Sequence, residues 1–118
     1  YSALDVSGNN LTPTYDSQAS IYSSLQTLLD NAIVNLSSTI GSGIPNDKDI
    51  YYEGDADKWI KLAYSLKARF YLHVKNYPLA KANAVLGIDN AVDDFKAIFG
   101  NASYQDFNPF YSFLIYDL

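Results

Sequence analysis

Apolar residues recur at steps of three and four along the first third of the chain, the spacing that places side chains on one face of an α-helix. Asp16 or Ser17 is the expected N-cap, because a short polar side chain there accepts hydrogen bonds from unpaired backbone N–H groups. The pattern predicts a loop over residues 1–15 and a helix over residues 16–40. The stripe consists of Tyr15, Ala19, Ile21, Tyr22, Leu25, Leu28, Leu29, Ala32, Ile33, Leu36 and Ile40.

A second and broader helical pattern runs over residues 55–76, with Asp55 as the expected N-cap. A stripe that covers more than one face predicts that this helix contacts two neighbours. Residues 41–54, which lie between the two helices, are predicted to form an acidic loop that carries the aromatic pair Tyr51-Tyr52. The apolar positions of the second helix are Trp59, Ile60, Leu62, Ala63, Tyr64, Leu66, Phe70, Tyr71, Leu72 and Val74.

The remaining residues predict short helices over 78–99 and an aromatic loop or tail over 100–118. Pro78 suits the first turn of a helix that runs to Gly87, and a further turn of helix fits 91–99. Helices joined by short loops indicate an all-α class with antiparallel neighbours. Trp59-x-x-Leu62-Ala63 and Tyr77-Pro78-Leu79-Ala80 are similar to the two helices of a tetratricopeptide repeat, although the spacing between them is longer than in a regular repeat.

Length and composition narrow the possible partners. The 118 residues correspond to one ordinary domain, so residues 1–118 are predicted to form a single helical segment. A formal net charge of −5 argues against nucleic acid and anionic membrane surfaces, since both are bound through an excess of Lys and Arg. The chain has no cysteine, which excludes disulfides and thiolate sites. No apolar run approaches the ~20 residues that a membrane-spanning helix needs.

The acidic residues around the start of the second helix could offer carboxylate oxygens to a hard cation. The EF-hand spacing is not met, because Tyr52 stands where glycine is needed and Lys58 where the bidentate glutamate is needed. A solvated loop with an N-cap is therefore favoured over a metal site, and no cofactor is expected. The acidic positions are Asp47, Asp49, Glu53, Asp55 and Asp57.

Catalytic chemistry finds no support in the sequence. His73 is the only histidine, and no nucleophile or carboxylate partner stands at a recognisable spacing from it. Asp93 and Asp94 are adjacent, so on a helix they would point about 100° apart and not flank one bond. We expect both aspartates to lie on a solvated face and the protein not to be an enzyme.

An aromatic tail offers a candidate ligand site. Aromatic rings pack against the C–H faces of sugars, and side-chain amides satisfy sugar hydroxyls. The alternative, which we favour from the sequence alone, is that these rings pack beneath other parts of a larger protein. The candidate ligand-binding residues are Tyr104, Phe107, Asn108, Phe110 and Tyr111.

Two blocks of sequence resemble a known family. The first is Thr12-Pro13-Thr14-Tyr15-Asp16-Ser17-Gln18 with Ile21-Tyr22 and Leu28-Leu29-Asp30-Asn31-Ala32-Ile33 after it. The second is Asp49-Ile50-Tyr51-Tyr52, Gly54-Asp55, Lys58-Trp59 and Lys61-Leu62-Ala63, followed by Ser65-Leu66-Lys67-Ala68-Arg69, with a weaker third match at Asn108-Pro109-Phe110-Tyr111. In order and spacing, residues 12–111 resemble the SusD/RagB family, in particular its SusD-like subgroup.

The resemblance implies a surface-exposed lipoprotein of the bacterial outer membrane. Such a protein binds glycans, or sometimes peptides, without catalysis and delivers them to a TonB-dependent, SusC-like transporter. Family members are larger helical proteins, so we expect this chain to be a central portion whose lipid anchor lies outside it. The alternative function is a helical protein-interaction scaffold without a small-molecule ligand, which the broad apolar stripe of the second helix also fits.

Overall fold

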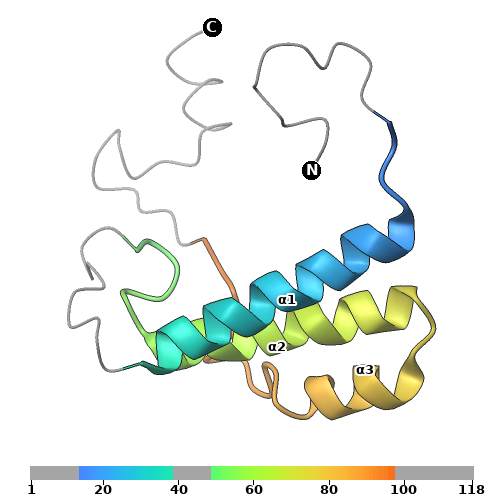
Figure 1. The fold of residues 1–118 in the computed structure, drawn as a ribbon. Helices are drawn as coiled ribbons and strands as arrows, with labels where there is room; N and C mark the ends of the chain where they lie inside the picture. The colour runs from blue at the N-terminus through green and yellow to red at the C-terminus, as the bar shows by residue number, and fades with distance from the viewer. Residues whose placement is uncertain (1–13, 39–48, 98–118) are drawn as a thin grey trace, which may run out of the picture.

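Three helices form one antiparallel layer in a computed structural model that describes residues 14–38 and 49–97. They are α1 (Gln18–Ser37), α2 (Ala56–His73) and α3 (Tyr77–Ala84). Helix α2 lies between α1 and α3 and runs antiparallel to both (Figure 1). Within the described ranges no strand occurs, so the predicted all-α class is confirmed. The expectation that the second helix has two neighbours is confirmed as well.

Local hydrogen bonds fix where α1 and α2 begin. The Ser17 hydroxyl accepts the N–H of Ser20 at 3.2 Å, so Ser17 and not Asp16 caps α1. The Asp55 carboxylate accepts the N–H groups of Asp57 and Lys58 at 3.0 and 3.2 Å, which confirms the expected cap of α2. Each cap satisfies backbone donors that have no partner inside the helix.

Both helices end earlier than the apolar pattern suggested. Helix α1 stops at Ser37, where the next residue, Ser38, turns back and donates its hydroxyl and its N–H to the carbonyl of Asn35 at 2.7 and 3.2 Å. Helix α2 stops at His73. Lys75 adopts a left-handed conformation with φ of 59°, and the N–H of Asn76 reaches the carbonyl of Tyr71 at 2.9 Å. This is a Schellman ending, which apolar periodicity does not reveal.

The predicted turn of helix over 91–99 is wrong for residues 91–97, which are not helical. The Asn90 side chain accepts the N–H of Val92 at 2.9 Å and donates to the Asp93 carboxylate at 2.9 Å. Such side-chain bonds compete with helical backbone bonds. Residues 94–97 accordingly form no regular secondary structure. Pro78, in contrast, lies in the first turn of α3 as predicted.

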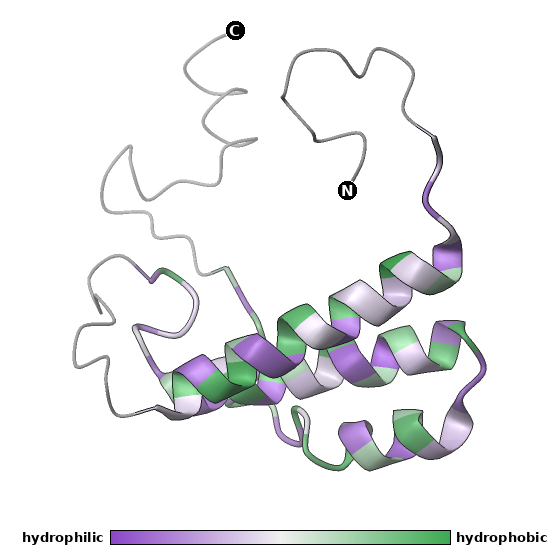
Figure 2. Ribbon diagram, viewed as in Figure 1, coloured by the Kyte–Doolittle hydropathy of each residue, from purple (hydrophilic) through white to green (hydrophobic). Residues whose placement is uncertain are grey.

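The packing between α1 and α2 combines aromatic and charged contacts. Tyr22 meets Phe70 edge-on with 5.8 Å between ring centroids. Lys67 is only 5% exposed, and its ammonium group lies 2.6 Å from the Asp30 carboxylate. Hydrophobic residues occur along the whole of both helices (Figure 2). Even so, no residue of α1 is buried, and the stripe residues Ile21 and Leu28 are 38% and 63% exposed. The apolar stripe of α1 is therefore only partly covered by the described part of the chain.

Gly87 allows the chain to fold back against α2 after α3. A Cβ atom at this position would stand 2.5 Å from the Ser65 hydroxyl oxygen. That oxygen cannot move freely, because it accepts the N–H of Ile88 at 2.9 Å and its hydroxyl donates to the Lys61 carbonyl at 3.0 Å. The close approach places residues 88–97, the returning chain, alongside α2.

We expect Gly87→Ala to lower the free energy of unfolding by about 1–3 kcal/mol, because the added methyl group overpacks the contact with Ser65. Urea unfolding measures this loss. The double variant Gly87→Ala/Ser65→Ala should lose less than the sum of the two single variants, since removing the hydroxyl relieves the clash. Strictly additive losses would contradict the proposed contact.

Candidate functional site

The Asp49 carboxylate organises the turn that precedes α2. One of its oxygens accepts the N–H groups of Tyr51 and Tyr52 at 3.1 and 3.2 Å. The other accepts the N–H of Gly54 at 3.0 Å and the indole N–H of Trp59 at 2.6 Å. Glu53 and Gly54 take left-handed conformations with φ of 54° and 82°. Asp49, which is half-exposed, therefore uses its side chain to hold the backbone of the turn in place.

The environment of Asp49 lowers its pKa. Partial burial disfavours the carboxylate, but the hydrogen bonds from Trp59 and from the backbone of Gly54, Tyr51 and Tyr52 outweigh it. The pKa falls from 3.8 to about 2. Asp49 is consequently ionised throughout the physiological range and stays available as an acceptor to all its donors.

Four aromatic rings gather around this turn. Tyr51 stacks on Phe95 with 4.3 Å between centroids, and Tyr52 meets Trp59 edge-on at 5.2 Å. Trp59 also lies 5.7 Å from Phe95, so the rings form one cluster. Tyr52 is buried and Trp59 half-buried, whereas Tyr51 and Phe95 are 37% and 45% exposed. Trp59 thus belongs to the interior of the cluster, and Tyr51 and Phe95 form its outer edge.

A partly buried ion pair brings Phe95 to the turn. The Lys61 ammonium group lies 2.6 Å from Asp93 and 3.1 Å from Asp89, and the Tyr52 hydroxyl donates to the Asp93 carbonyl at 2.8 Å. The hydrogen bond from Lys61 lowers the pKa of Asp93, which keeps this pair charged. Asp93 is only 8% exposed, so the expected solvated face is wrong for this residue. Asp94 next to it is exposed.

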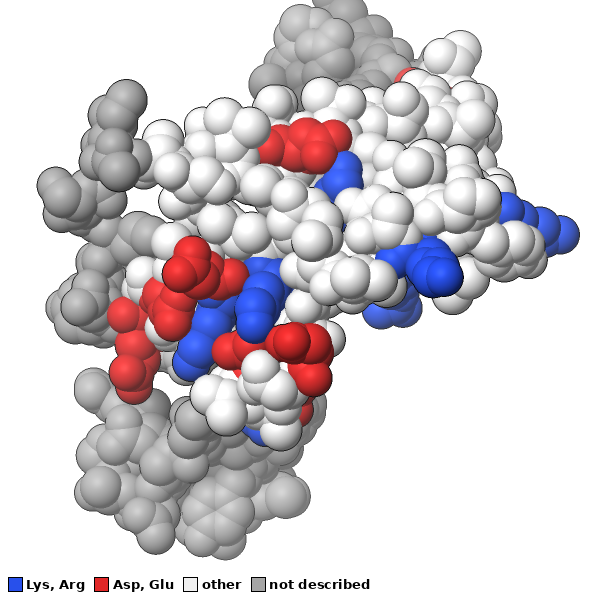
Figure 3. Space-filling view, turned by 90° about the horizontal axis from the view of Figure 1, so that it is seen from below, with Lys and Arg blue, Asp and Glu red and all other residues white. Residues whose placement is uncertain are grey.

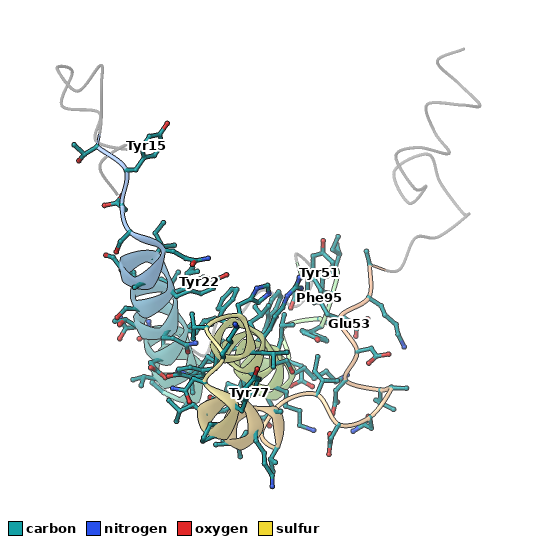
Figure 4. The ribbon with its side chains drawn as sticks, turned by 90° about the vertical axis from the view of Figure 1, so that its right-hand side faces the viewer. Tyr15, Tyr22, Tyr51, Glu53, Tyr77 and Phe95 are labelled. Carbon is teal, nitrogen blue, oxygen red and sulfur yellow. The ribbon has the colours of Figure 1, made fainter. Side chains whose placement is uncertain are left out.

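An open groove of about 660 Å³ lies between the turn and the returning chain. Its volume falls in the range of about 300–1,000 Å³ that small-molecule sites occupy. Figure 4 shows Tyr51, Glu53 and Phe95 on the side of the molecule away from α1. Acidic and basic side chains lie next to one another on the face seen in Figure 3. Ile50, Tyr51 and Glu53 line the groove from the turn, Lys58 from α2, and Val92, Asp94 and Lys96 from the returning chain.

A second hollow of about 350 Å³ lies between α1 and α2 and is mostly apolar. Tyr22 and Phe70 line it together with Gln26, whose carbonyl oxygen is buried and accepts no hydrogen bond. The amide nitrogen of Gln26 does donate, to the Lys67 carbonyl at 3.2 Å. His73 stacks on Tyr22 at 6.1 Å. The lone histidine therefore belongs to this aromatic contact between the helices.

The candidate ligand-binding residues of the aromatic tail lie outside the described residues. These are Tyr104, Phe107, Asn108, Phe110 and Tyr111.

Within 14–38 and 49–97, no three His, Cys, Asp or Glu side chains converge as a metal site, and no helix is long and apolar enough to cross a membrane. Phe95, Lys61 and Asp93 were not singled out as site residues, because their roles depend on contacts made across about 30 to 40 positions of sequence. The turn at Asp49 could have been predicted locally, because an aspartate five residues before Gly54 can accept backbone N–H groups of a turn.

The acid stability of the chain should depend on Asp49. Its pKa is lower in the folded state than the ordinary value of 3.8, so the stabilisation is complete above that pH and is lost as the pH falls towards about 2. Asp49→Asn should remove this component of the pH dependence and lower stability at neutral pH. Thermal melting of both proteins between pH 7 and pH 2 measures it. A constant difference in melting temperature across that range would contradict the role assigned to the carboxylate.

Trp59 should tolerate phenylalanine better than alanine. Trp59→Ala removes the central ring of the cluster and leaves a cavity, which costs about 3 kcal/mol, the lower end for aromatic residues, since Trp59 is half-buried. Trp59→Phe keeps a ring but removes the donor to Asp49, so it should raise the pKa of that carboxyl group. Urea unfolding and NMR titration of Asp49 measure the two effects. Equal losses of stability in both variants would show that the hydrogen bond outweighs ring packing.

Comparison with known proteins agrees with the helical architecture. A sequence model of the SusD-like family, described as "Starch-binding associating with outer membrane", matches residues 1–113. No curated protein and no solved structure gives a significant match to the chain. Since the family match extends over nearly all of the 118 residues, the chain belongs to the SusD-like family of outer-membrane-associated, starch-binding proteins.

Proposed function

We propose that this protein binds glycans or other oligomeric nutrients at the bacterial outer-membrane surface and passes them, without catalysis, to a TonB-dependent transporter. The observation that carries the proposal is the family match over residues 1–113, because the family description combines starch binding with the outer membrane. A lipid anchor outside these residues would hold the protein at the surface.

The chemistry of the described surface supports ligand binding. Tyr51 offers a partly exposed ring, and Glu53 and Asp94 offer carboxylate oxygens beside the same groove. Ligand sites commonly combine apolar walls with a small number of polar groups that set orientation. The aromatic tail stays a proposed second contact region, with Tyr104, Phe107, Asn108, Phe110 and Tyr111 as its candidate residues.

One observation favours a second candidate function, the helical interaction scaffold. Leu28 and Val34 on α1 are 63% and 66% exposed, and they leave apolar surface for another protein or another part of a larger chain. The genomic neighbourhood separates the two functions. An adjacent gene for a TonB-dependent transporter supports nutrient uptake, and its absence supports the scaffold.

We expect the protein to bind at least one member of a glycan panel without altering it. The panel contains maltoheptaose, xylohexaose, mannohexaose, oligogalacturonate and a chondroitin hexasaccharide. Isothermal titration calorimetry measures binding, and chromatography of each glycan after incubation checks for cleavage. Phe107→Ala should weaken binding if the tail contributes to the site, with Phe99→Ala as a control elsewhere in the chain. Failure of every glycan to bind would leave the scaffold as the better reading.

A further inference from the structure

The groove between the Asp49 turn and the returning chain presents both apolar and polar groups to solvent. Ile50, Tyr51 and Val92, which line it, are 62%, 37% and 77% exposed. Glu53, Asp94 and Lys96 are exposed beside them. A ligand that fits must therefore have an apolar face and hydrogen-bonding groups around its edge, as a sugar ring has.

The Tyr51 ring is held in place before any ligand arrives. Its backbone N–H is bound by Asp49 at 3.1 Å, and its ring rests on Phe95 at 4.3 Å. Phe95 is positioned in turn by the ion pair between Lys61 and Asp93 two residues earlier. A ring that is already fixed loses little conformational entropy on binding, which favours affinity. Tyr51 is thus restrained by Asp49 and Phe95, and Phe95 in turn by the Lys61–Asp93 pair.

The charges of the groove indicate the class of glycan. Three carboxylates line it (Asp49, Glu53 and Asp94), against two ammonium groups (Lys58 and Lys96), which leaves one net negative charge. The Lys96 ammonium group lies 3.1 Å from the Asp94 carboxylate and donates to the Ala91 carbonyl at 3.0 Å, so its charge is already compensated. An acidic sugar would meet like charge there, whereas the hydroxyl groups of a neutral sugar can both donate and accept.

We infer that this groove binds a neutral glycan, with the apolar face of one sugar ring against Tyr51 and its hydroxyl groups on Glu53, Asp94 and Lys58. The assignment deepens the proposed glycan-binding function and rests on it. It adds a location, a contact residue and a preference for uncharged over acidic saccharides.

The glycan panel, applied to the whole chain and two groove variants, tests the assignment. The wild-type protein should bind a neutral member at least about tenfold more tightly than either acidic member. Tyr51→Ala should weaken the best neutral ligand about tenfold or more. Val92→Glu should do the same, since it replaces part of the apolar lining of the groove by a charged side chain. Because Val92 is 77% exposed, this change should leave the fold intact.

Matched controls come from exposed residues elsewhere. Val85 is 75% exposed and Tyr77 is 60% exposed, and neither lines the groove. Figure 4 shows Tyr77 well apart from Tyr51. Val85→Glu and Tyr77→Ala should leave glycan affinity within about twofold of the wild type. Thermal melting of every variant checks the fold, and Val92→Glu decides the matter if Tyr51→Ala proves unstable.

Three outcomes would overturn the assignment, and they differ in what they say about function. If the wild type binds a neutral glycan and both groove variants retain full affinity, the groove is not the binding site, but the proposed glycan-binding function stands. If only acidic members bind, the preference for neutral sugars is wrong and glycan binding again stands. If no member binds, the proposed function fails together with the groove.

Discussion

The hydrogen bonds of one carboxylate hold together the part of this molecule that carries the candidate site. Asp49 accepts three backbone N–H groups and the indole N–H of Trp59. Through the backbone bonds it fixes the turn, and through Trp59 it ties that turn to α2. It restrains the left-handed pair Glu53 and Gly54 together with two backbone hydrogen bonds, from the N–H of Glu53 to the Asp49 carbonyl at 3.0 Å and from the N–H of Asp55 to the Tyr52 carbonyl at 2.9 Å. The negative charge is stabilised because donors surround it.

The second restraint acts from the other side of the groove and is long-range. Lys61, on α2, is paired with Asp89 and Asp93, which follow it by about 30 residues. Burying the Asp93 carboxylate alone would be costly, so this carboxylate is stable in its buried position only with the Lys61 ammonium group beside it. Gly87 makes it geometrically possible, since the chain passes too close to Ser65 for any side chain. Two charged groups and one glycine thus bring Phe95 against Tyr51.

The helices themselves are only partly covered by the described residues. Ala63 and Lys67 are the buried residues of α2, while α1 contributes none. Such a layer has little core of its own, because most apolar side chains keep contact with solvent. The described residues therefore carry two different surfaces. One is the exposed apolar surface of α1, which suits packing, and the other is the groove with both apolar and polar lining, which suits a ligand.

The amino-acid sequence by itself determined the class, the helix starts and the family. Periodicity of three and four needs only local geometry, and the cap at Asp55 and the first-turn Pro78 act within a few residues, whereas the structure was needed to choose Ser17 over Asp16 as the cap of α1. The tertiary structure alone decided the site. The sequence predicts a solvated acid at Asp93 and a helical position at Phe95, whereas the structure pairs Asp93 with Lys61 and stacks Phe95 on Tyr51. Both depend on pairings across about 30 to 45 positions, and a pattern read along the chain carries no information about which distant partner a charge or a ring will meet.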